Sequence, residues 1–155
     1  MGHTIQGFLG KSETIKEIVS PLSTGQYAVI ELPQNIHCLF LSCGAWDIIA
    51  ERQNVTLNNN ITPFDFLDTA TKEYLQNIKP SGKFIYIETD YYGGRGSQAA
   101  GIFEDGILLD VYNSEGKTDG AINTALRFIG VIKEPDADEF ETLNLHKYRH
   151  MPDFN

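Results

Sequence analysis

The chain has 155 residues and 41% hydrophobic content, which suits one globular domain with its own core and excludes wholesale disorder. The formal net charge of -9 argues against nucleic acid as a partner and favours a basic protein partner. No apolar run approaches the ~18 residues of a membrane span, and Met1-Gly2-His3-Thr4 lacks the features of a signal peptide, so we expect a cytoplasmic protein.

In the first half of the chain, apolar periodicity and turn residues predict alternating strands and helices. The expected elements are a strand over 4–9, a helix capped by Ser12, strands over 27–32 and 36–42 joined by a turn at 33–35, and a short helix over 44–51. A further helix is expected to begin at Thr62-Pro63-Phe64-Asp65, because threonine caps and proline suits the first helical position. Pro80-Ser81-Gly82 ends that helix.

The second half opens with the strand predicted over 83–90, where Phe84 and Tyr86 point one way and Ile85 and Ile87 the other. Because both of its faces are apolar, we expect a central strand covered on both sides. Strands over 97–103 and 107–112 follow, joined by a turn at 104–106, and then a helix over 120–129 that Asp119 caps and Gly130 terminates. The acidic run 134–141 is expected to be a solvated surface segment.

These elements predict one α+β domain spanning residues 1–155, with a mostly antiparallel sheet of about six strands and three to four helices.

The segment 87–101 is the strongest candidate for a site. It joins two apolar strands through a corner rich in glycine, and its polar side chains are typical of a recognition surface. The candidate partner-binding residues are Glu88, Asp90, Tyr91, Tyr92, Arg95 and Gln98. We expect Gly93, Gly94 and Gly96 to have a backbone role, with positive φ in at least one of them.

Other interpretations of this corner stay open. Glu88 and Asp90 share a strand face, which suits contact with a basic partner, an acid–base pair, a divalent ion, or simply a strand end reaching solvent. The glycine-rich turn fits an anion-binding nest or a bulged hairpin in which Arg95 balances the nearby carboxylates.

No catalytic or metal-binding signature accompanies this segment. His146 and His150 lie four apart, but only Asp153 offers a further ligand near them, so we expect no metal and no cofactor. Cys38 and Cys43 are too few and too irregular for a disulfide framework, and Cys38 in its apolar run is expected to be a buried small residue.

Three stretches carry a family resemblance. Ile5-Gln6-Gly7-Phe8-Leu9-Gly10, Leu32-Pro33-Gln34-Asn35 and Tyr91-Tyr92-Gly93-Gly94-Arg95-Gly96-Ser97-Gln98-Ala99-Ala100 resemble a family of small bacterial proteins of unassigned function, some of which are similar to immunity proteins of polymorphic toxin systems. The resemblance implies a neutralising binder and supplies no catalytic residues.

The leading expectation is therefore an acidic protein-binding module of the immunity type, which occludes a basic toxin domain and is not an enzyme. The alternative is a small enzyme or small-ligand-binding protein that uses Glu88, Asp90 and the Gly93–Gly96 region. A third is a homo-oligomer with the tyrosine-rich corner at its subunit interface.

Overall fold

The computed structural model describes residues 2–55, 57–92, 95–115 and 120–154. Six strands form one antiparallel sheet in the order β2-β3-β1-β4-β5-β6, so β4 lies in its middle. The strands are β1 (Gln6–Lys11), β2 (Tyr27–Leu32), β3 (Ile36–Leu41), β4 (Lys83–Tyr92), β5 (Arg95–Glu104) and β6 (Ile107–Glu115). The fold is thus the predicted α+β class with a six-stranded antiparallel sheet.

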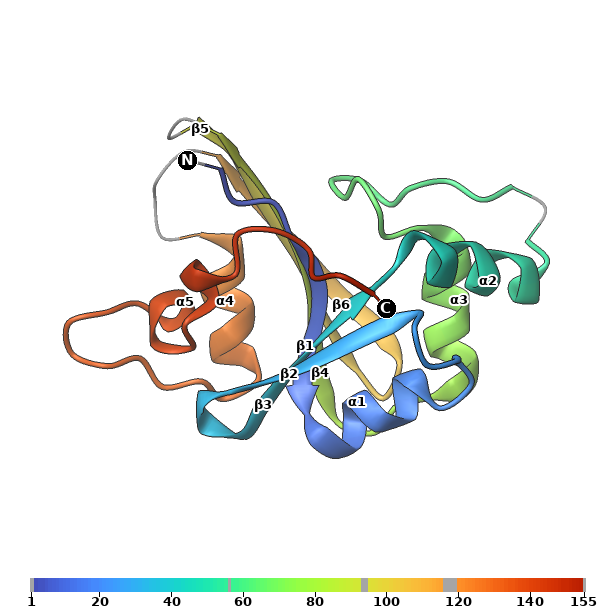
Figure 1. The fold of residues 1–155 in the computed structure, drawn as a ribbon, viewed down its shortest axis with the longest axis horizontal. Helices are drawn as coiled ribbons and strands as arrows, with labels where there is room; N and C mark the ends of the chain where they lie inside the picture. The colour runs from blue at the N-terminus through green and yellow to red at the C-terminus, as the bar shows by residue number, and fades with distance from the viewer. Residues whose placement is uncertain (1, 56, 93–94, 116–119, 155) are drawn as a thin grey trace.

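Helices cover both faces of this sheet, as Figure 1 shows. On one side lie α1 (Ser12–Val19), α2 (Cys43–Gln53) and α3 (Thr69–Ile78); on the other lie α4 (Ala121–Phe128) and the short α5 (Glu139–Thr142). Single 3-10 turns occupy Pro33–Asn35 and Leu145–Lys147. Within the described residues, no helix is both long and apolar enough to cross a membrane.

The sheet therefore separates two apolar cores, and β4 contributes to both. Phe84 and Tyr86 are buried on the α1–α3 side, whereas Ile85 and Ile87 are buried on the α4–α5 side. This alternation follows from the two-residue period of a strand and confirms the prediction of a central strand covered on both faces.

Two predicted helix starts are wrong. Helix α3 begins at Thr69, not near Thr62, and its N-cap is Asp68, whose side chain accepts a hydrogen bond from the Thr71 N–H at 2.8 Å. The segment 62–68 stays outside the helix because the N–H groups of residues 65–67 bind a carboxylate of the sheet, described below. In α1, Ser12 is the first helical residue and Lys11 the N-cap, because β1 runs into the helix without a linker.

The predicted cap of helix α4, Asp119, lies outside the described residues, and the described contacts at this helix start come from the sheet. The Ile122 N–H donates to the side-chain oxygen of Gln98 at 2.8 Å, and the Ala121 N–H donates to the Ser114 hydroxyl at 3.2 Å. Strands β5 and β6 thus satisfy the N–H groups that a helix N-terminus leaves unpaired. Gly130 does follow the helix with φ 91°, as predicted.

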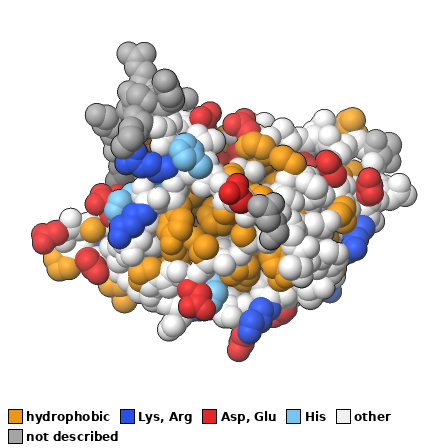
Figure 2. Space-filling model, in the orientation of Figure 1, with side chains coloured by type: hydrophobic (Ala, Val, Ile, Leu, Met, Phe, Trp, Pro, Cys, Tyr) orange, Lys and Arg blue, Asp and Glu red, His pale blue; other side chains and the backbone are white. Residues whose placement is uncertain are grey.

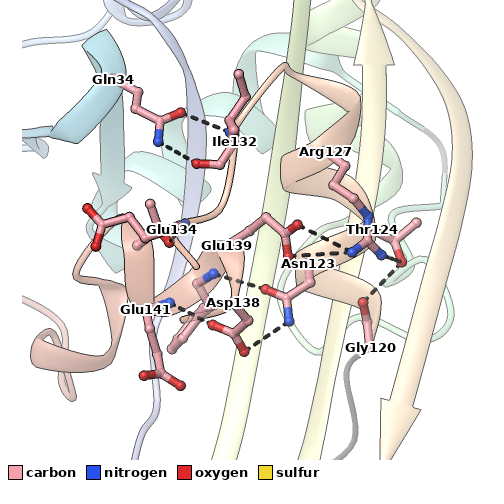
Figure 3. A network of polar contacts seen from close by, with 12 residues as sticks. Gln34, Gly120, Asn123, Thr124, Arg127, Ile132, Glu134, Asp138, Glu139 and Glu141 are labelled. Carbon is pink, nitrogen blue, oxygen red and sulfur yellow. Dashed lines mark hydrogen bonds and ion pairs between the residues drawn. The ribbon is translucent and has the colours of Figure 1, made fainter. Parts of the chain in front are cut away.

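The acidic run 134–141 is only partly the solvated segment that its charge predicts. Glu139 is 3% exposed and lies 3.4 Å from the Arg127 guanidinium, and the Asn123 side chain accepts from the Phe140 N–H at 2.9 Å. Figure 3 shows these contacts holding the start of α5 against α4. The prediction fails here because α4 and α5 pack together and supply hydrogen-bond and ion-pair partners for polar groups that the sequence alone would place in solvent.

His3 connects the N-terminal segment to β4 and to the 3-10 turn at Leu145–Lys147. Its Nε2 donates to the Leu145 carbonyl oxygen at 3.0 Å, so Nδ1 of the neutral ring accepts from the Thr89 hydroxyl at 2.8 Å. Burial is the main cause that lowers the pKa of His3 from 6.5, and Arg149, His146 and His150 lower it further, while the bond to Leu145 opposes them.

We expect this histidine to make the fold less stable in mild acid. Because its folded-state pKa lies below 6.5, the unfolded chain binds more protons, so the contribution is complete above that value and is lost as pH falls through the folded pKa. Urea unfolding at about pH 7.5 and about pH 5.5 measures the loss. The loss should be smaller in His3→Gln than in the native chain, and an equal loss in both would contradict this role for His3.

Candidate functional site

The glycine-rich corner is the end of a long hairpin. Strands β4 and β5 continue to Tyr92 and from Arg95, with Asp90 opposite Ser97 and Tyr91 opposite Gly96. Gly96 has φ 149°, which meets the expectation that one of the three glycines has a positive φ. Gly93 and Gly94 lie outside the described residues, as do the side chains of Tyr92 and Arg95.

The predicted site residues that are described do not form one surface. Glu88 and Asp90 follow Tyr86 on the α1–α3 side, whereas Tyr91 and Gln98 lie on the α4–α5 side. Residues one apart on a strand point to opposite faces, so this division follows from the strand itself. Their closeness in the sequence therefore does not bring these four side chains together.

Glu88 holds the loop between α2 and α3 onto the sheet. One of its oxygens accepts from the Asp65 N–H at 2.7 Å, and the other accepts from the Phe66 and Leu67 N–H groups at 3.0 and 3.1 Å. The Tyr86 hydroxyl donates to that second oxygen at 2.6 Å. Three consecutive backbone N–H groups converge on the carboxylate as in an anion-binding nest.

This arrangement corrects the expectation that Glu88 is exposed near the strand end. Glu88 is only 7% exposed, and all four hydrogen bonds to its carboxylate come from the chain itself. Burial, and then the neighbouring Glu88 carboxylate, raise the pKa of Tyr86 well above its ordinary value, so its hydroxyl stays protonated and donates. Glu88 is thus a structural residue that shapes the loop.

Tyr91 and Gln98 are likewise engaged within the chain. The Gln98 amide donates to the Tyr91 hydroxyl at 2.9 Å, while its oxygen accepts from the Ile122 N–H. The first contact joins the two strands of the hairpin, and the second holds the hairpin against α4. Of the predicted residues with a described side chain, Asp90 is the one that is well exposed.

A hollow of about 220 Å³ lies between the hairpin and the loop that Glu88 holds. Asp90, Ser97 and Ala99 contribute from β4 and β5, and Asp65 and Phe66 contribute from the loop; we call these five residues the acidic groove. The space exists because the residues opposite Asp90 and Glu88 on β5 are the small Ser97 and Ala99. A smaller hollow of about 160 Å³ shares Ser97 and Ala99 and extends toward β6.

The acidic groove combines charge with an apolar side chain. Asp65 and Asp90 are exposed, Phe66 is 42% exposed, and none of the described residues around the hollow is basic. Sequence reasoning found Asp90 but missed Asp65 and Phe66, because it placed them inside a helix. No local signal identifies them, since their position depends on Glu88, more than 20 residues later in the chain.

The remaining candidates from the sequence contribute no chemistry to this groove. Cys38 is buried, as predicted, and burial raises the pKa of its thiol. Cys43 is exposed, and both cysteines are free. The part of the chain that is described contains no group of three or more His, Cys, Asp or Glu side chains arranged to hold a metal ion.

Searches against family models, curated proteins and solved structures find no match to this chain.

Proposed function

We propose that this protein is an acidic protein-binding module that neutralises a basic toxin domain by direct binding, in the manner of an immunity protein. The observation that carries the proposal is the acidic groove, where two exposed carboxylates flank an exposed aromatic ring and no described basic side chain balances them. Such a surface is complementary to a lysine- or arginine-rich surface, and the net charge of -9 steers a basic partner toward it.

The geometry supports binding over catalysis. The acid–base pair that the sequence suggested was Glu88 with Asp90, but Glu88 has its oxygens occupied by four donors from the chain and does not reach a substrate. The hollow of about 220 Å³ is also smaller than the roughly 300 to 1,000 Å³ of ordinary small-molecule sites. A protein partner does not need a deep pocket, because it contributes its own protruding side chains.

Within the acidic groove, Phe66 and the two aspartates have different expected roles. An exposed aromatic ring provides apolar area for close packing, and its face attracts a cationic group. Asp65 and Asp90 lie on the loop and on β4, so the pair can receive a basic side chain from two sides. Truncation of Phe66 should therefore mainly raise the dissociation rate, whereas reversal of the aspartates should mainly lower the association rate.

The test uses the protein encoded immediately upstream of this chain. We expect that protein to arrest growth when expressed alone, and co-expression of this chain to restore growth. In surface plasmon resonance, the association rate of the pair should fall about tenfold as salt rises from about 50 to about 500 mM.

Charge-reversal variants localise the contact. The double variant Asp65→Lys and Asp90→Lys should slow association and abolish the rescue of growth. The control is Glu13→Lys on the distant α1, which also alters the net charge but should leave the association rate and the rescue nearly unchanged. An upstream protein that neither binds nor is toxic would refute the proposal. An association rate that changes neither with salt nor with reversal of the two aspartates would also refute it.

A further inference from the structure

A second hollow lies on the α4–α5 side of the sheet, beside the edge strand β2. It measures about 430 Å³, and Ile30 of β2 and Phe40 of β3 form its apolar floor. The C-terminal segment supplies the rest of its lining, namely Lys147, Tyr148, Arg149, His150 and Pro152. Figure 2 shows an apolar patch in the middle of the face where β2 and this segment lie, with basic side chains along one margin and acidic side chains at its upper and lower edges.

The hollow exists because the helices cover only part of this face. Helix α4 packs on β4, β5 and β6, which leaves β1, β3 and β2 to the C-terminal segment. That segment is attached through Met151, whose sulfur accepts from the Gln6 N–H at 3.4 Å. A single extended segment is narrower than a helix, so Ile30 of β2 stays partly exposed beside it, whereas Phe40 of β3 is only 1% exposed.

The charged side chains that line this hollow are basic, although the chain as a whole is acidic. Three basic side chains, Lys147, Arg149 and His150, fall within four residues of a protein whose net charge is -9. Among the described residues, neither the Lys147 ammonium nor the His150 ring has a hydrogen-bond or ion-pair partner. Unpaired basic groups beside an apolar floor are complementary to an anion that carries an apolar body.

We propose that this hollow binds a small organic anion, specifically a monocarboxylate with a medium-length alkyl or aromatic body. The carboxylate lies against Lys147 and His150, and the apolar body covers Ile30 and Phe40. The volume of about 430 Å³ falls within the range of roughly 300 to 1,000 Å³ that such ligands occupy. An anionic membrane is a poor alternative, because a chain with net charge -9 is repelled by it.

This site does not depend on the proposed toxin neutralisation. It lies on the other face of the sheet from the acidic groove and shares no residue with it. The basic side chains of this hollow would select a negatively charged ligand, whereas the acidic groove selects a positively charged partner.

Titration calorimetry with octanoate, octanol and octylamine tests the proposal. The three probes have the same alkyl chain and differ in head-group charge at neutral pH. Octanoate should bind at least about fivefold more tightly than octanol, and octylamine should bind most weakly. Ile30→Thr, which keeps the branch at Cβ but replaces the ethyl arm with a hydroxyl, should weaken octanoate binding while preserving this order.

Lys147→Glu should weaken octanoate binding about fivefold or more, whereas Lys16→Glu should leave it within about twofold. Lys16 is an exposed lysine of α1 on the other side of the sheet, so the pair separates a local contact from the change in net charge. Circular dichroism melting confirms that both variants fold. The proposal is overturned by absent octanoate binding, by equal binding of octanol, by equal effects of the two lysine variants, or by co-sedimentation of the protein with phosphatidylglycerol vesicles.

Discussion

Replacing Glu88 by glutamine is expected to lower the free energy of unfolding by about 3 kcal/mol, one of the two largest effects that we predict. The native carboxylate accepts from three backbone N–H groups and from the Tyr86 hydroxyl. A glutamine has one acceptor oxygen, so its NH2 group must face at least one donor, and the remaining bonds lose their charge assistance. Urea unfolding with an unchanged m-value measures the loss.

Asp90→Asn is the matched control for this prediction. Asp90 lies two residues further along the same strand, on the same face, but its side chain is exposed. The same change of chemistry there should alter stability by no more than about 0.5 kcal/mol. In Glu88→Gln, amide hydrogen exchange should quicken first at residues 65–67, because their N–H groups bind the carboxylate. If Glu88→Gln is as stable as Asp90→Asn, Glu88 does not hold the loop.

The second large effect is expected for Gly96→Ala, which should destabilise the fold by about 3 kcal/mol or more. Gly96 has φ 149°, and a Cβ atom there would overlap the Asp90 carbonyl oxygen and lie 2.7 Å from the Tyr91 Cα. Both neighbours are backbone atoms of the paired strand, so they cannot move aside as a flexible side chain would. The hairpin must open at this point to admit the methyl group.

Gly130→Ala separates the two causes. Gly130 has φ 91°, and a Cβ there meets no atom within 4 Å, so alanine introduces only the backbone strain of about 1 kcal/mol. The excess loss in Gly96→Ala then measures the contact between the strands. Thermal or urea unfolding of both variants gives the comparison, and equal losses would show that the tight pairing at Gly96 contributes nothing.

The sequence predicted most elements of the fold because their signals are local. The alternation at residues 84–87 predicted a central strand, and β2 has the predicted bounds of Tyr27–Leu32. The helix starts failed where local signals compete with distant partners. Thr62-Pro63 has the composition of a helix start, but the N–H groups at residues 65–67 bind Glu88, and Asp68 takes the capping role.

The candidate site shows the same division between local and distant causes. The sequence by itself determined the hairpin, a positive φ in at least one glycine of its turn and the acidic character of the chain, because backbone restriction and formal charge depend on residue type. Only the tertiary structure decided which side chains face outward. It buried Glu88 under four donors and joined Asp65 and Phe66 to Asp90, because the partners of a polar group depend on which segments the fold brings together.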